Sequence, residues 1–520
     1  MKFTELFAGL LRPIGEYPSG DELPQGLAAM VQPLETIPLH EVVIDSRDVV
    51  RGDCFVALPG EHVNGHDYVG HALGRGAQVV LIHEDLPRDD YPDTQWLDLR
   101  PAIENTHPLA LPTLNSRPCV IRVENTLAAL QRLAAFWRAK YRNLRVVGIT
   151  GSVGKTSTKE LLAQVLSQHF HVLKTEGNQN NEIGVPLSLL KLTPEHEYAV
   201  VEMGMYARGE IALLARLAQP VVGVVTMVAP VHLGRLGSIE AIAQAKAELI
   251  EALPPQGLAV LNDDDERVRA MRAVSKAPVM TYGLTPHADV WADDIASYGL
   301  DGIEFTVHQG QEVLPMHVPL LGRHSVHTAL GAALVARHAG LDWAEILEGF
   351  LIPSPQLRLA VVDGPFGSLV LDDTYNASLE STLAALNLLE EVNGGSGNGT
   401  SNGNSTLPHQ KPPRVAVLGD MLELGETEME AHREVGCRAG VVAQYVVCVG
   451  ERARWIAEEA IACGASPDHV WHVADNASAL AVLHELLHER SIILVKGSRG
   501  MSMDEIVTGL ATMADTNMED

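Results

Sequence analysis

The chain is poor in positive charge, in paired cysteines and in long apolar runs. It has 38 Lys and Arg residues against 66 Asp and Glu, which gives a formal net charge of −28 at pH 7. A surface this acidic repels the phosphates of DNA and RNA, so we expect no nucleic-acid partner. If the protein binds an anionic nucleotide, it must do so through local positive groups and bound cations.

The cysteine content argues against a disulfide framework or a metal-binding motif. There are five cysteines, an odd number, and no C-x-x-C spacing among them: Cys54, Cys119, Cys437, Cys448 and Cys463. This pattern predicts reduced, buried thiols in a cytosolic protein, and nothing in it supports a catalytic cysteine.

No run of residues approaches the ~18 apolar positions of a membrane-spanning helix. The first 24 residues lack a sustained apolar stretch and soon turn acidic, which is not the pattern of a signal peptide. We therefore expect a cytoplasmic protein without a membrane span.

The length of 520 residues suggests roughly three domains, and the pattern of elements predicts an α/β fold. Residues 1–120 are interpreted as a small α/β domain. Residues 121–353 are interpreted as a parallel-sheet domain, with strands expected at 145–150, 198–204, 221–228 and 257–263 and a helix at 238–253. Residues 354–520 are interpreted as a smaller, doubly wound Rossmann-like domain, with strands expected at 367–373, 414–420, 444–450, 469–475 and 491–497.

Two segments read as connections between packed elements. Residues 100–118 are rich in proline and polar side chains and are interpreted as a linker. Residues 393–413 consist mainly of Gly, Ser and Asn, a composition that cannot bury a core, so a disordered surface loop is expected there.

The segment GITGSVGKTSTKE, residues 148–160, has the pattern of a strand, a glycine loop and a helix. Backbone N–H groups of such a loop cradle phosphates, while Lys155 can reach the β and γ oxygens and Thr156 can hold magnesium. Ile149 stands where the usual first glycine would be, and the additional glycine is Gly151. The expected ATP-binding residues of this loop are Gly151, Ser152, Val153, Gly154, Lys155, Thr156 and Ser157.

Other polar residues follow predicted strands, where parallel sheets bind their ligands. Glu202 stands where a nucleotide-binding sheet presents a metal-holding carboxylate, although a solvated acid fits the pattern equally well. His232 and Lys246 are fourteen residues apart, and spacing alone does not assign them a function.

Amide and charged side chains supply further candidates for a binding site. Asn180 and Asn181 could bind a substrate, or they could cap a turn and start a helix. Asn376 has the same two interpretations, a ligand contact or a helix cap. Lys496 and Arg499 offer cations that could hold a carboxylate.

Taken together and in order, these motifs resemble those of the Mur ligase family over nearly the whole chain. The resemblance implies three domains: one that binds a UDP-sugar, one that binds ATP, and a Rossmann-like C-terminal domain. It also implies an ATP-dependent ligase that joins D-Ala-D-Ala to UDP-MurNAc-tripeptide through an acyl phosphate, in peptidoglycan precursor synthesis. The resemblance lies in DSRDVVRGDCFVAL (45–58), TGSVGKTS (150–157), NNEIGVP (180–186), VHLGRLGSIEAIAQAKAEL (231–249), LNDDD (261–265), DDTYNAS (372–378), VLGDMLELG (417–425) and VKGSRGM (495–501).

By the same resemblance, Thr156 and Glu202 match a first magnesium site, and His232 matches a ligand near a second. Lys246 matches the lysine that the family carbamylates with CO2, and a carbamate would supply oxygen donors that an ammonium lacks. Catalytic roles are expected for Lys155, Glu202, His232 and Lys246. Further ATP contacts are expected from Asn262, His324, Arg358 and Asp373.

The substrate contacts follow from the resemblance in the same way. Ser46 and Arg47 match the loop that binds the UDP-sugar, and Asn180 and Asn181 match amides that face the substrate. Asp373, Tyr375 and Asn376 match C-terminal residues that close on ATP and the dipeptide, and Lys496 is expected to bind substrate. A monomer is expected.

The chain departs from the family pattern at four places. Ser325 and Thr328 replace two asparagines, Leu357 replaces a glycine of the interdomain hinge, and Leu379 replaces a proline. A hydroxyl cannot make the paired donor and acceptor contact that an amide can, so nucleotide contacts from the segment around His324 are open to question.

Four alternative functions compete with this interpretation. A ligase for the third amino acid would carry an Asp-Asn-Pro-Arg motif, which the chain lacks. In folylpolyglutamate synthase the P-loop lies near the N-terminus, whereas here residues 1–144 precede it. A P-loop kinase would not need a UDP-sugar domain. A catalytically impaired nucleotide-binding homologue would be consistent with the replaced asparagines, but not with intact Lys155, Glu202, His232 and Lys246.

Overall fold

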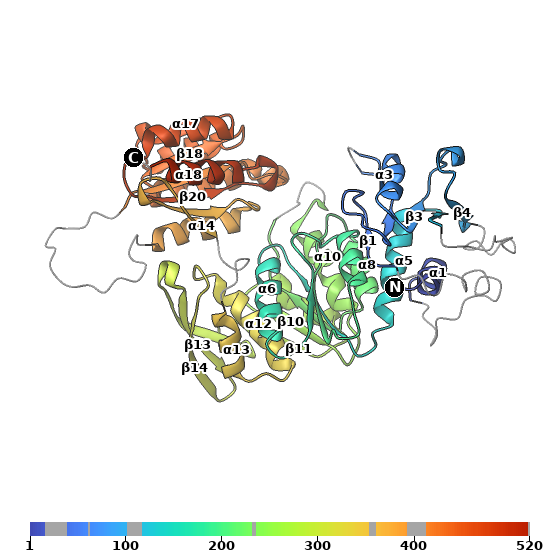
Figure 1. Cartoon of the computed structure of the whole chain (residues 1–520). Helices are drawn as coiled ribbons and strands as arrows, with labels where there is room; N and C mark the ends of the chain where they lie inside the picture. Colours follow the sequence, from blue (N-terminus) through green and yellow to red (C-terminus); the bar gives the residue numbers. More distant parts are fainter. Residues whose placement is uncertain are drawn as a thin grey trace.

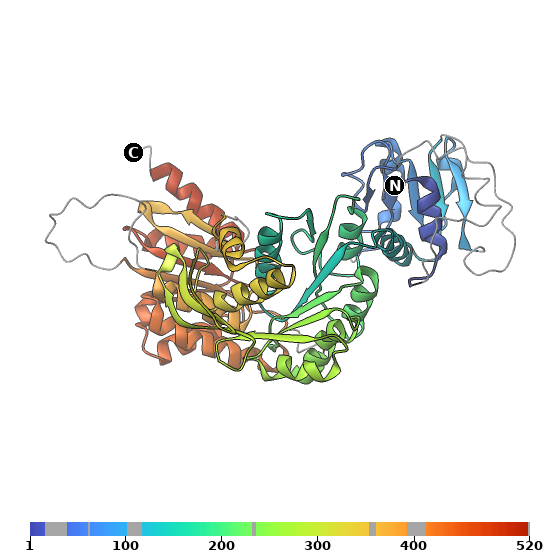
Figure 2. The same cartoon turned by 90° about the horizontal axis from the view of Figure 1, so that it is seen from below.

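The protein folds into three α/β units, each built on its own sheet. The computed structural model describes residues 1–15, 39–60, 63–100, 117–230, 236–352, 360–392 and 412–517. In Figures 1 and 2 the largest sheet lies between the other two, with the N-terminal unit at one end and the C-terminal unit at the other. The predicted α/β class is confirmed, while the exact domain boundaries stay a prediction.

The first unit has a five-stranded parallel sheet in the order β1-β2-β3-β5-β4. One face of the sheet is covered by α1 and α5, and α3 packs on the other face. The sheet includes β5 and so extends past residue 120. The strands are β1 (Val42–Val43), β2 (Cys54–Val56), β3 (Val79–Ile82), β4 (Gln95–Asp98) and β5 (Cys119–Arg122), and the helices are α1 (Phe3–Leu11), α3 (Val69–Gly74) and α5 (Thr126–Ala139).

The second unit has a nine-stranded sheet in the order β14-β13-β12-β11-β10-β9-β6-β8-β7. Strands β6 to β11 are parallel to one another and consist largely of Val, Leu, Ile and Ala, since helices cover both faces. The strands are β6 (Arg145–Thr150), β7 (Val172–Lys174), β8 (Tyr198–Glu202), β9 (Val222–Val225), β10 (Leu258–Asn262), β11 (Val279–Gly283), β12 (Val290–Ser297), β13 (Ile303–Gln309) and β14 (Glu312–Val318).

The helices of this unit form two layers. One layer fills the core that contains α6, α12 and α13, and the other fills the core that contains α7, α8 and α10. They are α6 (Lys155–Leu166), α7 (Gly184–Leu190), α8 (Glu210–Ala218), α10 (Ile239–Glu251), α11 (Glu266–Ala270), α12 (Ser325–His338) and α13 (Trp343–Leu351).

The third unit has a six-stranded sheet in the order β15-β16-β20-β17-β18-β19, in which only β15 is antiparallel to its neighbour. Helices lie on both faces, as expected for a doubly wound fold. The strands are β15 (Ala360–Asp363), β16 (Leu369–Asp373), β17 (Arg414–Gly419), β18 (Tyr445–Val449), β19 (Val470–Val473) and β20 (Ile492–Lys496), and the helices are α14 (Leu379–Glu391), α15 (Glu428–Val442), α16 (Arg454–Ala462), α17 (Asn476–Leu486) and α18 (Asp504–Asn517).

The cysteines require a correction. Cys437 in α15 and Cys463, directly after α16, form a disulfide with a Cα–Cα distance of 5.2 Å. The expectation that all five thiols are reduced is therefore wrong for this pair, because two packed helices bring together residues 26 positions apart. Cys54, Cys119 and Cys448 are free and buried, as expected.

Several predictions fall on residues outside the described ranges. They concern His232, Leu357, Arg358, most of the 100–118 linker and most of the 393–413 loop. Within the described ranges, no helix is both long enough and apolar enough to cross a membrane.

Candidate active site

The glycine loop joins β6 to α6 and lies against the segment that follows β9. Gly154 precedes α6 with a φ of +87°, a conformation that favours glycine. A Cβ on Gly151 would lie 1.8 Å from Thr226 Oγ1, so the additional glycine noted in the sequence is required for this close approach.

Hydrogen bonds to the neighbouring strand end hold the loop in shape. The Thr226 hydroxyl donates to the Val153 carbonyl at 2.6 Å, and the Ser152 backbone N–H donates to Met227 O at 2.7 Å. Ser157 is exposed on the first turn of α6. These two hydrogen bonds therefore fix the conformation of the loop.

Lys155 lies over the loop itself. Its Nζ donates to Gly151 O at 2.9 Å and to Ser152 O at 3.3 Å. Burial lowers the pKa of the Lys155 ammonium, while the Glu202 carboxylate opposes this shift. The predicted phosphate-binding cation thus sits at the mouth of the loop.

Thr156 and Glu202 are brought together as the sequence predicted for a metal pair. The buried Glu202 carboxylate accepts a hydrogen bond from the Thr156 hydroxyl at 2.9 Å through Oε2 and one from Asn180 Nδ2 at 2.8 Å through Oε1. A hydroxyl and a carboxylate are hard oxygen donors of the kind that Mg²⁺ prefers, so this pair fits such an ion. Asn180 thus contacts the Glu202 carboxylate, whereas the Asn181 side chain accepts from the N–H groups of Ile183 and Gly184 where α7 begins.

A buried ion cluster lies behind this pair and was missed from the sequence. Lys159 is fully buried, and its Nζ lies 3.0 Å from Glu160 Oε1 and 3.8 Å from Glu202 Oε2. Lys174 of β7 pairs with the other oxygen of Glu160. The only signal in the sequence was that Lys159 follows Lys155 by one helical turn.

Lys246 lies in α10 and is 3% exposed. Burial lowers its pKa well below the usual range for a lysine, and the charge of Lys155 lowers it further. Both effects favour the neutral amine, which is the form that can react with CO2.

Asn262 and His324 lie further along the same sheet edge. Asn262 Nδ2 donates to Thr226 O at 2.8 Å, at the end of β10. His324 precedes α12, and the surrounding protein, with smaller contributions from His327 and Lys496, lowers its pKa to about 4. Ser325 stands where the family has an asparagine, and its hydroxyl donates to Leu321 O at 2.7 Å. The hydroxyl hydrogen therefore already has a partner within the protein.

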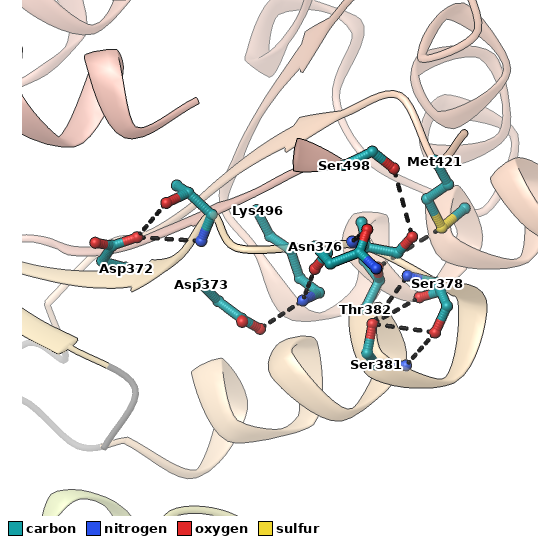
Figure 3. A network of polar contacts seen from close by, with 11 residues as sticks. Asp372, Asp373, Asn376, Ser378, Ser381, Thr382, Met421, Lys496 and Ser498 are labelled. Atoms are coloured by element: carbon teal, nitrogen blue, oxygen red, sulfur yellow. Dashed lines mark hydrogen bonds and ion pairs between the residues drawn. The ribbon is translucent and has the colours of Figure 1, made fainter. Parts of the chain in front are cut away.

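The third unit contributes a polar network at the ends of β16 and β20 (Figure 3). Lys496 is buried and donates to Asp373 Oδ2 at 2.6 Å and to Asn376 O at 2.8 Å. Burial raises the pKa of Asp373, and Lys496 opposes this shift. Ser378 caps α14, and Leu379, which replaces the family proline, is the first residue of that helix.

Tyr375 links the third unit to the magnesium pair. Its exposed ring lies under the Arg499 guanidinium, which is 5.6 Å from the ring centroid. Burial raises the pKa of the Tyr375 phenol, and the next largest contribution is the charge of Glu202 in the central unit. Tyr375 of the third unit therefore lies near enough to Glu202 of the second unit for their charges to interact.

The structure places Ser46 and Arg47 in the first unit, apart from this network. Ser46 Oγ lies 2.9 Å from His71 Nδ1. Arg47 donates through Nε to Asp45 Oδ1 at 2.9 Å, and this contact holds the pKa of Asp45 at about 2.

One other cluster in the described residues has the composition of a metal site: His66, His83 and Glu84. The ring of His66 is already committed, because Nε2 accepts the His83 N–H at 3.1 Å and Nδ1 lies 2.8 Å from Asn64 Oδ1. These contacts leave no lone pair on His66 for a metal, so we interpret the cluster as structural.

Known proteins share both the sequence and the fold. The Mur ligase family catalytic domain matches residues 38–138, the Mur ligase middle domain residues 149–336, and the Mur ligase glutamate ligase domain residues 357–499. UDP-N-acetylmuramoyl-tripeptide–D-alanyl-D-alanine ligase from Synechocystis sp. is 34% identical over 93% of this chain and 94% of its own length. The Escherichia coli ligase of the same name is 34% identical over 91% and 94%.

The crystal structure of MurF from Acinetobacter baumannii has a TM-score of 0.75 at 27% identity, with 98% of each chain covered. The fold and the site define a P-loop enzyme in which a second α/β unit closes on the nucleotide edge of the sheet. The chain belongs to the Mur ligase family.

Proposed function

We propose that the chain is an ATP-dependent ligase that joins D-Ala-D-Ala to the terminal carboxylate of UDP-MurNAc-tripeptide. The observation that carries this proposal is that Tyr375, in the DDTYNAS segment of the third unit, lies near enough to Glu202 of the central unit for the charge of that carboxylate to raise the pKa of the Tyr375 phenol. Two relatives that match this chain over more than nine tenths of its length are named for the same activity. The product would be the pentapeptide precursor of peptidoglycan.

The proposed reaction has two steps. A carboxylate oxygen of the tripeptide attacks the γ-phosphorus of ATP, and the bond to the β-γ bridging oxygen breaks to release ADP. The amine of D-Ala-D-Ala then attacks the carbonyl carbon of the acyl phosphate. The tetrahedral intermediate loses inorganic phosphate, which keeps the former carboxylate oxygen, and the ammonium proton passes to solvent.

Charge neutralisation is the main task of the site, because a carboxylate and a triphosphate repel each other. In our proposal, Lys155 and the loop N–H groups bind the phosphates, and Thr156 and Glu202 hold one Mg²⁺. His232 and a carbamylated Lys246 hold a second ion. The ions would supply positive charge next to the transferring phosphoryl group.

The low pKa of Lys246 supports the carbamate, since only a neutral amine attacks CO2. Mass spectrometry of the native protein at neutral pH, with and without bicarbonate, would detect a gain of one CO2. A Lys246→Arg variant should lack that gain, and the same gain in the variant would refute the assignment.

The remaining predicted residues take substrate roles in this proposal. Ser46 and Arg47 bind the UDP-sugar, Asn181 lies near the peptide, and Arg358 contacts ATP. Asp373, Asn376 and Lys496 close on ATP and the dipeptide, with Tyr375 at the junction. The enzyme would act in the cytoplasm, where ATP is supplied.

The decisive experiment measures phosphate release from ATP with UDP-MurNAc-tripeptide, with and without D-Ala-D-Ala, and records the product mass. Release that needs both substrates, with a mass gain of one dipeptide, is the expected result. A third-residue ligase would instead release phosphate in a parallel reaction with UDP-MurNAc-dipeptide and a free amino acid, and the product would gain the mass of that amino acid. No release in any combination would indicate a nucleotide-binding protein without ligase activity.

A further inference from the structure

The position of the P-loop determines on which side the base of the nucleotide must lie. The loop follows β6, and the strand order on one side is β9, β10 and β11. Neighbouring strands are about 4.8 Å apart, so the ends of β10 and β11 lie about 10 to 14 Å from the loop. On the other side is β8, which carries Glu202 and the magnesium pair, so the γ-phosphate faces β8 and the base faces β10 and β11.

Most polar side chains at the ends of β10 and β11 are already engaged. Asn262 donates to Thr226 O at 2.8 Å and accepts from the Asp264 N–H at 3.1 Å. The Ser325 hydroxyl donates to Leu321 O, which precedes α12. These side chains can stabilise the pocket, but their hydrogen-bonding groups already have partners within the protein.

His327, on the first turn of α12, is the exception. Its Nε2 lies 2.7 Å from Asp264 Oδ2, and the same carboxylate oxygen accepts the Leu284 N–H at 2.8 Å, directly after β11. The two side chains are 29% and 25% exposed, so the pair is anchored in the fold and open to solvent.

The Asp264 contact also sets the hydrogen-bonding character of the ring. Because a carboxylate accepts, Nε2 carries the proton and donates it to Asp264, and in the neutral ring Nδ1 then keeps a free lone pair. Nδ1 has no hydrogen-bond partner among the described residues. The pair therefore presents one oriented acceptor at the edge where the base must lie.

We propose that the Asp264–His327 pair positions and selects the nucleoside of ATP, with His327 Nδ1 accepting a hydrogen bond from the 6-amino group of adenine. This pair would replace the amide contacts that Ser325 and Thr328 cannot make. The inference rests on the proposed use of ATP, and it adds a residue pair that determines nucleotide specificity.

The test compares the wild-type enzyme with His327→Ala and His327→Asn, using ATP and ITP, which has a carbonyl in place of the 6-amino group. Loss of one hydrogen bond should raise KM for ATP about tenfold in His327→Ala. KM for ITP, kcat and KM for UDP-MurNAc-tripeptide should stay within about twofold. His327→Asn keeps a carbonyl acceptor and should recover part of the preference for ATP.

His338→Ala, at the other end of α12, is the matched control and should leave the ratio of the two nucleotides unchanged. An unchanged KM for ATP in His327→Ala would overturn the proposal. So would an equal rise for ATP and ITP, which would indicate a purely structural histidine.

Calorimetric titration of each variant with ADP and with IDP separates this inference from the proposed function. A tenfold preference for ADP that disappears in His327→Ala would support the nucleoside contact even if the wild-type chain formed no ligase product. Equal affinities of the wild-type chain for ADP and IDP would refute the contact even if the ligase reaction proceeded.

Discussion

The phosphate end and the nucleoside end of the central sheet edge are built in different ways. At the phosphate end, Lys155 donates to carbonyls of the loop, the Thr156 hydroxyl donates to Glu202, and the buried Lys159 ammonium lies 3.8 Å from the Glu202 carboxylate. At the nucleoside end, two family asparagines are missing, and one anchored pair, Asp264 and His327, presents the free acceptor.

The difference shows where substitution is tolerated along one binding site. Phosphate and metal contacts carry the charge that the reaction must neutralise, so each group there is supported by several others. A base contributes a few directional hydrogen bonds, and neighbouring side chains can take over this task. The predictions below test this contrast from the largest expected effect to the smallest.

Lys155→Ala should have the largest effect, because it removes the cation at the β and γ phosphates. We expect kcat/KM for ATP to fall by about a thousandfold or more while the protein stays folded. Lys191→Ala, an exposed lysine after α7, is the control and should behave like the wild type. Retention of a tenth of the activity in Lys155→Ala would contradict the role given to the loop.

Glu202→Gln should lower kcat by about a hundredfold, because a neutral amide supplies a much weaker magnesium ligand than a carboxylate. A titration of the reaction rate against Mg²⁺ should show a higher half-saturating concentration than in the wild type. If the Mg²⁺ titrations of the two proteins coincide, the assignment of the magnesium pair is wrong.

Thr226→Val should have an intermediate effect, since it removes the hydroxyl that ties the loop to the strand end next to it. The Val153 carbonyl would lose its 2.6 Å hydrogen bond, which should cost about 1–3 kcal/mol of unfolding free energy. KM for ATP should rise several-fold. Urea denaturation with parallel steady-state kinetics would measure both effects, and a variant equal to the wild type in both would show that the loop does not depend on this contact.

Ser325→Ala should change KM for ATP by less than about twofold. Its hydroxyl donates to Leu321 O within the protein, so its loss removes no nucleotide contact. Steady-state kinetics over a range of ATP concentrations would detect a larger change, which would mean that this position still contacts ATP.

The smallest effect concerns pH. The pKa of His324 is lowered to about 4, so its ring stays neutral above that pH and gains a proton only as the pH falls toward 4. The ratio of KM for ATP between His324→Gln and the wild type should therefore be constant from about pH 6 to pH 8. A change in this ratio near pH 6.5 would show that the histidine titrates normally.

The same contrast explains how much could be predicted from the sequence. Lys155 and Thr156 follow the buried strand β6, and Glu202 ends the buried strand β8. The apolar runs of these strands are continuous, so both the strands and the polar residues at their ends could be recognised in the sequence. The strands β12 to β14 were not predicted, because they pair antiparallel with one another and are partly exposed and thus lack such runs.

Contacts between distant segments could not be predicted from the sequence either. From the sequence, Lys159 would be assigned as a solvated lysine of an amphipathic helix. In the structure it is buried in an ion cluster with residues of β7 and β8. The Cys437–Cys463 disulfide depends on the packing of α15 against α16. The role proposed for His327 depends on its contact with Asp264, which is 63 positions away in the sequence.

The most direct test of the whole account follows the oxygen atoms of the acceptor carboxylate. UDP-MurNAc-tripeptide labelled with oxygen-18 in its terminal carboxylate would be turned over with ATP and D-Ala-D-Ala, and the released phosphate would be analysed by mass spectrometry. We predict one labelled oxygen in each phosphate, because the carboxylate attacks the γ-phosphorus and leaves its oxygen there. Unlabelled phosphate would mean that water cleaves ATP, and it would contradict activation of the carboxylate at this site.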